Sequence, residues 1–406
     1  MHMNSRGKIF FSILIVFFTV IRPVKGQMPD YASRIKTGKD LKVGAERMEA
    51  YLPLIKGKKI AIVANQTSRI GTTHLVDSLH KLGIKIQSVF APEHGFRGEQ
   101  GAGEKISNGV DSKTGIRIIS LYGKHLKPTK ADLAGTDIVL FDIQDVGARF
   151  YTYISTLQYV MEACSEQNKL LILLDRPNPN GFYVDGPVLD TAYRSFIGMN
   201  SIPVVHGMTI GEYAKMLNGE KWLKRKRTCS LKVIKVQGYT HKDLYQLPVR
   251  PSPNLPNMTA VYLYPSLCFF EGTRVSLGRG TELPFQCIGY PGYKGGNIEF
   301  TPRDLPGIAL NPPFKDSLCL GLDLRNATRD SVFRRLNLDW LIQFYASYPE
   351  KEAFFIPFFE KLAGTALLRK QIESGKSQDA IRKSWLQKLV QFKAVRKKYL
   401  LYPDFE

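Results

Sequence analysis

The chain has 406 residues, enough for two domains that each bury a sizeable core. With 44% hydrophobic and 23% charged residues and no low-complexity tract, the composition is typical of a globular protein, and wholesale disorder is not expected. The formal net charge of +21 indicates either a solvated basic surface or attraction to a polyanion. No nucleic-acid-binding motif accompanies the charge, so nucleic acid is not an expected partner, and an anionic cell-wall polymer is the favoured polyanion.

The N-terminus has the three regions of a secretory signal peptide. Arg6 and Lys8 precede an apolar run at residues 9–21, and a short segment at residues 23–26 then leads into polar sequence. The apolar run is short for a permanent membrane span, and no later stretch has the length or apolarity of one. We therefore expect residues 1–26 to be a signal peptide and the mature protein to be exported without a stable membrane span, to the periplasm or the extracellular space.

From about residue 58, short apolar runs alternate with stretches of helical periodicity. The sequence predicts strands at 58–65, 84–90, 116–122, 137–141 and 169–174, with a weaker one at 202–205. Helices are predicted at 72–82 and 151–164, and the capping box Thr209 to Glu212 opens another that runs to about 223. Fully apolar strands separated by amphipathic helices indicate a parallel sheet covered on both faces. Residues 27–245 are thus predicted to form a Rossmann-like α/β domain.

The amino-acid composition changes near residue 247. The segment "LPVRPSPNLPN" has four prolines and cannot form a helix or a central strand. Glycine-rich and aromatic-rich sequence follows to about residue 313, and helical stretches occur at 330–347 and 377–399. Residues 246–406 are predicted to form a smaller α+β domain, with the proline-rich segment as a hinge or as a strap that lines a cleft.

The five cysteines show neither CxxC nor Cys/His spacing, so a zinc site is not expected. Export would permit disulfides, but Cys164 lies on the apolar stripe of a predicted helix, which favours a core position. The chain also lacks the sequences GxGxxG after its first strand, GxxxxGK[ST] and GxSxG. Dinucleotide binding, P-loop chemistry and ordinary α/β-hydrolase chemistry are therefore disfavoured, and no cofactor or metal is expected.

Polar side chains follow most of the predicted strands. In an open parallel sheet, ligands bind outside the carboxyl ends of the strands, so these side chains are the candidates for a site. A collection of carboxylates, amides, Arg and His suits a sugar or a carboxylated substrate. The candidates are Asn65 after the first strand, Glu93 and His94 after the second, Asp142, Asp145 and Arg149 after the fourth, Asp175, Arg176 and Asn178 after the fifth, and His206 after the sixth.

Glu93 has a plausible chemical role. Pro92 fixes the approach to it, and nearby glycines let a ligand come close. A carboxyl group in a partly desolvated pocket holds its proton more readily, as the general acid of a glycosidase requires. Glycoside hydrolysis also needs a group that stabilises positive charge at the anomeric carbon. The candidates for this second role are Asp145, Asp142, Asp175 and Glu271.

Each candidate also has a purely structural interpretation. Glu93 could form an ion pair with Arg97 or His94 that shapes its loop. Asp142 and Asp175 suit the capping of a loop or helix, and Arg149 and Arg176 suit ion pairs with those acids.

Several motifs in order resemble those of the NamZ-type exo-β-N-acetylmuramidases, a family formerly known only as a domain of unknown function. They are "FAPEHGFRGEQGAGE", "VLFDIQDVGARFYTYISTL", "LLDRPNPNG", "VVHGMTIGEYAKMLN", "FFEGTRVSLGRGTELPFQ" and the closing "GTALLRKQIESGKSQDAIRKSW". The resemblance implies an exported hydrolase that releases N-acetylmuramic acid from the non-reducing end of peptidoglycan fragments. It also implies a Rossmann-like domain joined to a smaller one, with the active site between them. The family's proposed catalytic glutamate corresponds to Glu93.

We predict Glu93 and Asp145 as the catalytic pair, with Glu93 as general acid. Muramic acid carries a lactyl carboxylate, for which the loop arginines 97, 149, 176, 250, 274 and 279 compete. The predicted substrate-binding residues are Asn65, His94, Arg97, Arg149, Tyr151, Arg176, Asn178, His206, Glu271 and Arg279.

Two other function classes remain open from the sequence. A non-catalytic wall-glycan or solute-binding protein would use the same cleft and the same basic surface. An amidase or esterase would need an activated Ser or Cys, and no such setting is recognisable in the sequence.

Overall fold

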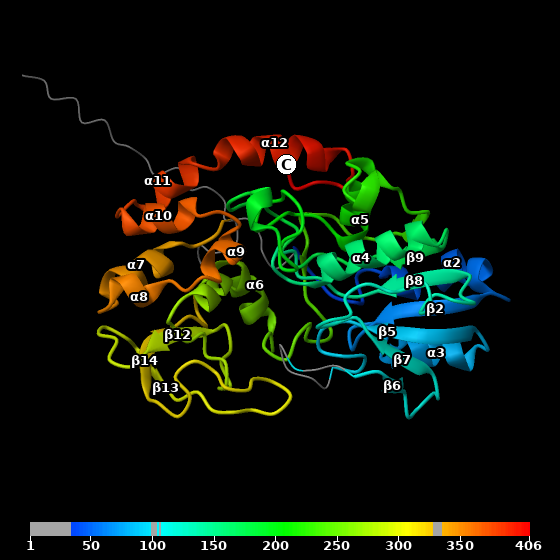
Figure 1. Cartoon of the computed structure of the whole chain (residues 1–406), viewed down its shortest axis with the longest axis horizontal. Helices are drawn as coiled ribbons and strands as arrows, with labels where there is room; N and C mark the ends of the chain where they lie inside the picture. The colour runs from blue at the N-terminus through cyan, green and yellow to red at the C-terminus, as the bar shows by residue number, and fades with distance from the viewer. Residues whose placement is uncertain (1–33, 99–103, 105–106, 328–334) are drawn as a thin grey trace, which may run out of the picture. The chain divides into compact units, whose positions relative to one another are not determined.

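The computed structural model describes residues 34–98, 104, 107–327 and 335–406 (Figure 1). The described residues form one compact unit. The predicted signal peptide at residues 1–26 lies outside the described residues. No described helix is both long enough and apolar enough to cross a bilayer.

A seven-stranded sheet forms the centre of the first part of the chain. All neighbouring strands are parallel except at one edge, where β6 (Gly109–Val110) runs antiparallel to β7 (Arg117–Ser120). All five residues of the central strand β8 are buried, because helices cover both faces of the sheet. The predicted Rossmann-like, mainly parallel α/β fold is confirmed. In spatial order the strands are β10 (Leu231–Ile234), β9 (Leu170–Leu174), β8 (Ile138–Asp142), β2 (Lys59–Ala64), β5 (Lys85–Ala91), β7 (Arg117–Ser120) and β6 (Gly109–Val110).

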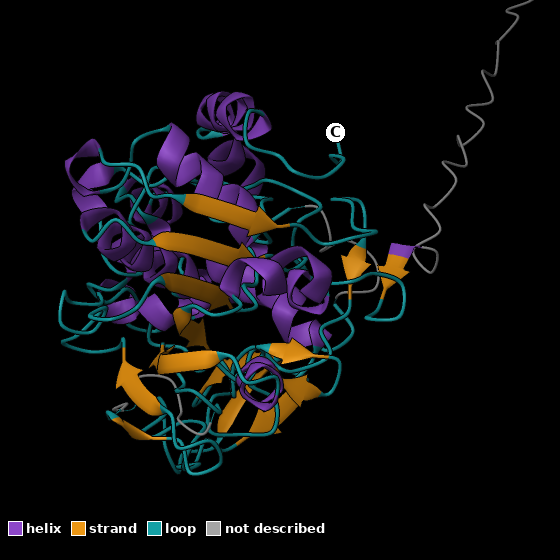
Figure 2. Cartoon of the chain, turned by 90° about the vertical axis from the view of Figure 1, so that its right-hand side faces the viewer, coloured by secondary structure: helices purple, strands orange, loops and turns teal. Residues whose placement is uncertain are grey.

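The two faces of the sheet pack against different helices (Figures 1 and 2). Alternate residues of β2, Ile60, Ile62 and Ala64, share an apolar cluster with side chains of α2 (Met48–Ile55) and α3 (Leu75–Lys81). The opposite face is covered by two further helices, α4 (Tyr153–Glu166) and α5 (Ile210–Gly219). Cys164 is fully buried on α4, which confirms its predicted core position, and all five cysteines are buried free thiols.

One predicted strand is wrong. Residues 202–205 make only isolated bridges, from Val205 to Ala148 and to Asp185, and the sixth parallel strand of the sheet is β10 instead. The segment is apolar because its side chains are buried between loops, and hydrophobicity alone does not distinguish that burial from a sheet position. His206 therefore does not follow a strand of the sheet.

Two short strand pairs complete the first part of the chain: β1 (Ile35–Lys36) with β11 (Leu244–Tyr245), and β3 (Arg69–Ile70) with β4 (Thr73–His74). The predicted capping box is present at the start of α5, where the Thr209 hydroxyl accepts from the Glu212 N–H and the Glu212 carboxylate accepts from the Thr209 N–H. The helix ends at Gly219, earlier than expected.

The second part of the chain consists of several helices and a three-stranded antiparallel sheet with the order β12-β14-β13. Its strands are β12 (Cys287–Tyr290), β13 (Ile298–Phe300) and β14 (Cys319–Asp323). Its helices are α6 (Met258–Leu267), the short 3-10 helix η4 (Cys268–Gly272), α7 (Asp339–Ser347), α8 (Lys351–Phe354), α9 (Phe359–Ala363), α10 (Leu367–Glu373), α11 (Gln378–Lys383) and α12 (Leu386–Lys397). The proline-rich segment contains neither helix nor strand, as predicted. The domain boundary at residues 245 and 246 stays a prediction.

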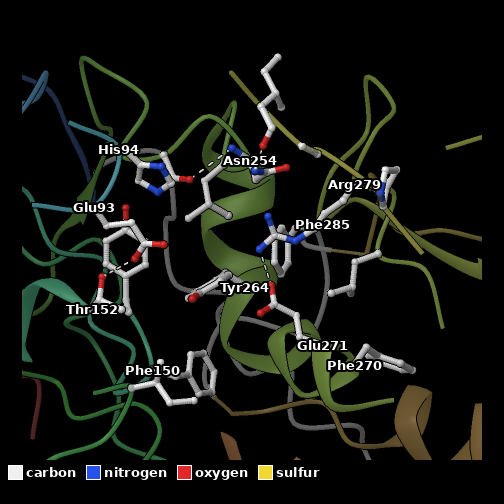
Figure 3. A pocket seen from close by; sticks show the side chains of 18 of the residues that line it. Glu93, His94, Phe150, Thr152, Asn254, Tyr264, Phe270, Glu271, Arg279 and Phe285 are labelled. Carbon is white, nitrogen blue, oxygen red and sulfur yellow. Dashed lines mark hydrogen bonds and ion pairs between the residues drawn. The ribbon is translucent and has the colours of Figure 1, made fainter. Parts of the chain in front are cut away.

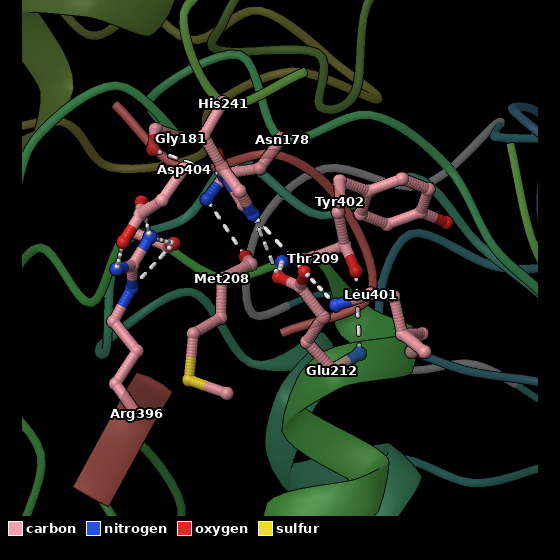
Figure 4. Close-up of polar contacts among 12 residues, drawn as sticks. Asn178, Gly181, Met208, Thr209, Glu212, His241, Arg396, Leu401, Tyr402 and Asp404 are labelled. Carbon is pink, nitrogen blue, oxygen red and sulfur yellow. Dashed lines mark hydrogen bonds and ion pairs between the residues drawn. The ribbon is translucent and has the colours of Figure 1, made fainter. Parts of the chain in front are cut away.

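The C-terminal tail after α12 is bound to the first part of the chain by buried polar contacts (Figure 4). The Tyr402 hydroxyl donates to Asp175, and the Leu401 N–H donates to Glu212, which also pairs with His241. Arg396 of α12 donates to the Gly207 carbonyl and forms a two-bond ion pair with Asp404. The last residues thus connect α12 to the loops at the carboxyl edge of the parallel sheet.

Candidate active site

A cavity of about 470 Å³ lies between the carboxyl ends of the parallel strands and the second part of the chain (Figure 3). Strands β5 and β7 contribute Glu93, His94 and Tyr122 through the loops that follow them. The opposite wall comes from α6, η4 and the loop before β12. Of the residues predicted for the site, Glu93, His94, Tyr151, Glu271 and Arg279 line this cavity.

Two hydroxyl groups hold the carboxyl group of Glu93. The Tyr122 hydroxyl donates to Oε1 at 2.9 Å, and Thr152 Oγ1 donates to Oε2 at 2.8 Å. Thr152 is the N-cap residue of α4, but its side chain does not bond to the helix, which leaves the hydroxyl for Glu93. Since a hydroxyl can donate or accept, the same two contacts can hold Glu93 in either protonation state. Glu93 does not form the ion pair with Arg97 that its structural interpretation predicted, because Arg97 pairs with Asp77 and Asp111.

His94 has an unusual backbone conformation beside Glu93. Its φ is 71°, in the left-handed region that few non-glycine residues adopt. The Gly95 N–H donates to the Pro92 carbonyl at 3.0 Å and closes a turn around Glu93 and His94. This turn aims both side chains at the cavity, and the strain at His94 is consistent with a functional loop.

Glu271 and Arg279 form an ion pair on the opposite side of the cavity from Glu93 (Figure 3). The guanidinium carbon of Arg279 also lies 5.0 Å from the centroid of the Phe285 ring. Phe285 itself has a φ of 56°, a strained value for a bulky residue. The guanidinium group of Arg279 therefore packs against the ring of a residue whose backbone has an uncommon conformation.

The remaining cavity wall is rich in aromatic side chains. The rings of Tyr151 and Tyr264 meet edge to face at 5.7 Å, and Phe150 packs against Tyr264 in the same way. The Tyr151 hydroxyl donates to the Pro251 carbonyl at 2.8 Å, which ties this wall to the proline-rich segment. Residues of that segment, Ser252, Asn254 and Leu255, line the cavity, which confirms its role as a cleft-lining strap.

The three other arginines predicted for the site have structural partners away from this cavity. Arg97 pairs with Asp77 and Asp111. Arg176 is paired with Asp142 at 2.6 Å, as its structural interpretation predicted. The predicted acid partner of Arg149 is wrong: its guanidinium is fully buried and donates to the carbonyl groups of Pro187, Ile202 and Leu362. Burial lowers the pKa of Arg149 to about 9. Its hydrogen bonds join loops of the first part of the chain to α9 of the second.

Asn65, Asn178 and His206 are also buried away from the cavity. Asn65 accepts from both the N–H and the hydroxyl of Thr67, and Asn178 donates to the Met208 carbonyl. His206 Nδ1 accepts from the Met208 N–H at 3.3 Å, so its proton lies on Nε2 in the neutral form. Burial, together with the nearby charges of Arg396 and Arg149, lowers the pKa of His206 to about 3, which keeps the ring neutral.

Asp145, the predicted partner of Glu93, does not line the cavity. Its Oδ2 accepts from the Gly147 N–H at 2.7 Å and lies 4.0 Å from His206 Nε2, whereas Oδ1 has no hydrogen-bond partner among the described residues. Burial raises the pKa of Asp145 from 3.8 to about 7, although N–H groups of residues 147 and 146 oppose the shift. Its catalytic role stays a prediction.

Replacement of Asp145 by Asn separates a structural role from a catalytic one. Between about pH 4 and pH 7 the carboxyl group of Asp145 is protonated in the folded state and ionised in the unfolded state. Its contribution to the free energy of unfolding is therefore fully present below about pH 4 and is lost as the pH rises through about 7. We expect Asp145→Asn to reduce this decline in the free energy of unfolding, measured by urea denaturation at several pH values. We also expect kcat to fall less than about tenfold. A loss as large as that of a general acid would instead assign Asp145 the predicted catalytic role.

The sequence interpretation missed Tyr122 and Thr152. Tyr122 is the last residue of the third predicted strand, 116–122, so the rule that selected Glu93 passed over it; in the structure the strand ends at Ser120 and Tyr122 lies in the loop that follows. Thr152 carried no such signal, because a Thr at a helix start is usually a cap. Asn254 and Phe285 come from the second part of the chain, where no sheet edge marks a site. Among the described residues, no three His, Cys, Asp or Glu side chains are grouped as a metal ion would require.

Comparisons with known proteins agree with the motifs. The profile of exo-β-N-acetylmuramidase NamZ matches with its N-terminal part at residues 60–259 and with its C-terminal part at residues 262–402. The peptidoglycan β-N-acetylmuramidase NamZ of Bacillus subtilis is 40% identical over 371 residues, which cover 87% of this chain and 89% of that protein.

Two crystal structures of DUF1343 family proteins from Bacteroides fragilis are also similar. One is 49% identical with a TM-score of 0.83 and covers 90% of this chain and 99% of its own. The other is 28% identical with a TM-score of 0.77 and covers 89% and 99%. The chain therefore belongs to the exo-β-N-acetylmuramidase NamZ family and is a glycosidase, which confirms that prediction over the alternative of a non-catalytic binding protein.

Proposed function

We propose that this enzyme releases N-acetylmuramic acid from the non-reducing end of peptidoglycan fragments, with Glu93 as general acid. The observation that carries the proposal is the position of Glu93. It lies on the wall of a cavity that is rich in aromatic side chains and large enough for a sugar, and two hydroxyl groups fix its carboxyl group. The relative from Bacillus subtilis, named for activity on peptidoglycan, supports this choice of substrate.

In this mechanism Glu93 gives its proton to the glycosidic oxygen while the bond from that oxygen to the anomeric carbon breaks. The leaving sugar departs as an alcohol, and positive charge develops at the anomeric carbon. Water then adds to that carbon, and ionised Glu93 takes up the proton that the water releases. Tyr122 and Thr152 keep the carboxyl group in one orientation through both steps, which limits the reorganisation that each proton transfer needs.

The developing positive charge needs a stabilising group. Glu271 is the other carboxylate among the described residues that line the cavity, and it is already paired with Arg279. Asp145 does not line the cavity, and the 2-acetamido group of the substrate is a further candidate. The substitution Asp145→Asn described above tests Asp145 alone, and a small effect on kcat leaves Glu271 and the 2-acetamido group as the candidates.

Product analysis tests the proposed activity. Incubation with a glycan fragment that ends in N-acetylmuramic acid should release that free monosaccharide, while a fragment capped at this end by N-acetylglucosamine should stay intact. Mass spectrometry of the products measures both. Cleavage within the capped fragment would contradict the exo-acting assignment.

We also propose that the chain is exported, on the basis of Arg6, Lys8 and the apolar run at residues 9–21. Expression of the full chain in a Gram-negative host, followed by mass spectrometry of the purified protein, should show cleavage near residue 26. A cytoplasmic protein that retains Arg6 and Lys8 would contradict export.

A basic surface supports the proposed contact with an anionic wall polymer. The fold brings together the two densest basic runs of the sequence, residues 221–227 and 383–398. Lys398 lies 3.8 Å from Glu220, and the Tyr399 hydroxyl donates to the same carboxylate at 2.6 Å. Between the runs lies a pocket of about 450 Å³. The exposed members of this basic surface are Lys221, Lys224, Arg225, Lys226, Arg227, Lys383, Lys388, Lys397 and Lys398.

Neutralisation of this surface should weaken binding to the wall polymer. We expect exchange of residues 224–227 for Gln to lower binding to insoluble cell walls about tenfold at low salt, since each lost cation removes a salt-sensitive contact. Exchange of four exposed lysines elsewhere, at 56, 58, 81 and 85, is the matched control. A sedimentation assay measures binding to walls with and without their anionic polymers. If both sets of substitutions lowered wall binding equally, the basic surface would not be a specific binding site for the polymer.

A further inference from the structure

Among the described residues, the cavity wall has one guanidinium group suited to an anionic substrate group. Six loop arginines compete for that role in the sequence, and the structure gives three of them, Arg97, Arg149 and Arg176, other partners. Arg274 is exposed and donates to the Ala353 carbonyl, and Arg250 does not line the cavity. Among the described residues that line the cavity, Arg279 is the only Arg or Lys.

The surroundings of Arg279 leave part of its guanidinium group available. Its Nη2 donates to Glu271, and this is the one hydrogen bond of the side chain within the described part of the protein. A guanidinium group has five N–H donors, so further donors can reach a ligand. The side chain keeps 22% of its surface exposed where it lines the cavity. Glu271 and Phe285 therefore orient the group without using all of its donors.

This arrangement favours a carboxylate as the ligand. Glu271 fixes one side of the planar guanidinium group, and the Phe285 ring supports its face, so little side-chain entropy is lost when an anion binds. The aromatic wall lowers the local dielectric constant, which strengthens a charge-assisted hydrogen bond. A planar carboxylate can accept two such bonds from one guanidinium group.

The position of Arg279 also fits the proposed substrate. In N-acetylmuramic acid the lactyl group leaves the ring at C3, whereas the bond to be cleaved is at C1. The acid at C1 and the group that reads the lactyl carboxylate must therefore lie at different places on the cavity wall. Figure 3 shows Glu93 and the Arg279 to Glu271 pair on opposite sides of the cavity.

We propose that Arg279 binds the lactyl carboxylate of the terminal N-acetylmuramic acid and thereby selects this sugar over N-acetylglucosamine, which lacks the group. Glu271 and Phe285 are positioning residues that hold the guanidinium group in place. The proposal rests on the proposed function, because it assumes that the terminal sugar occupies this cavity.

The test compares two aryl β-N-acetylmuramides, one with the free lactyl carboxylate and one with the corresponding lactamide. The wild-type enzyme should prefer the acid. Arg279→Met should lower kcat/KM on the acid about 10- to 100-fold, mainly through KM, with a much smaller fall on the lactamide. Arg279→Lys should be intermediate, because it keeps the charge but loses the planar fork. Arg274→Met, which alters an exposed arginine outside the cavity, should keep the wild-type preference.

Two additional variants make the result decisive. Arg279→Met leaves Glu271 unpaired, so the double variant Glu271→Gln with Arg279→Met is measured as well, and it should show the same loss of preference. Glu93→Gln should slow cleavage of both substrates equally and keep the preference, so failure of the general acid and failure of the anion site give different results.

If the wild type does not cleave the lactamide, calorimetric binding of N-acetylmuramic acid and its lactamide replaces the ratio of the two kcat/KM values. An equal effect of Arg279→Met on both compounds would overturn the proposal.

Discussion

Replacement of Glu93 by Gln should lower kcat about 100- to 10,000-fold on a disaccharide in which N-acetylmuramic acid is linked to N-acetylglucosamine, the range that a general acid contributes. The amide side chain would have nearly the same size and could still accept a hydrogen bond from the Tyr122 or Thr152 hydroxyl, but it has no acidic proton to give. A sugar alkoxide is a poor leaving group, so bond cleavage without that proton is slow. Released monosaccharide, measured over time, reports the rate.

The leaving group distinguishes loss of the acid from general damage to the site. A 2,4-dinitrophenyl leaving group departs without protonation, so Glu93→Gln should cost far less on such a glycoside than on the disaccharide. Unchanged urea denaturation would show that the variant folds. Near-normal turnover of the disaccharide, or equal losses on both substrates, would exclude Glu93 as the general acid.

Replacement of Arg396 by Met should lower the free energy of unfolding by about 3 kcal/mol, because it breaks a buried ion pair and leaves Asp404 without its partner. The Arg396 side chain is 1% exposed, and it also donates twice to the Gly207 carbonyl (Figure 4). Lys393→Met is the matched control, since Lys393 is also on α12 and pairs with Glu406 of the same tail, but at the surface. The control should change stability by about 0.5 kcal/mol or less, as measured by urea denaturation.

The pH dependence of the same variant provides an independent check. Burial raises the pKa of Asp404, but the hydrogen bonds from Arg396 outweigh this, and the net pKa is below the usual 3.8. A lowered native pKa stabilises the fold above pH 3.8, and this contribution is lost as pH falls below that value. Arg396→Met should therefore weaken the loss of stability in acid. Equal stability of the Arg396 and Lys393 variants would show that the tail is not a structural anchor.

The general acid candidate could be found from sequence because it depends on local order along the chain. Glu93 follows an apolar strand directly, and the carboxyl ends of parallel strands meet at one edge of the sheet. The same reasoning failed for His206, because the apolar residues before it are buried between loops and form no strand of the sheet. It also placed Arg149 and Arg176 at the site, since a loop arginine that binds a ligand and one that binds the protein have the same sequence pattern.

The sequence by itself determined the mainly parallel α/β fold, the strand-end position of Glu93 and, through several ordered motifs, the family. These features follow from hydrophobic periodicity and from short-range order along the chain. Only the tertiary structure decided which polar side chains share a cavity with Glu93. Tyr122 and Arg279 reach it from loops and Thr152 from the start of α4, positions far apart in the sequence that only packing brings together. The competing arginines 97, 149 and 176 bind Asp77, buried carbonyl groups and Asp142, respectively. These partners are distant in sequence, so no local pattern predicts the pairings.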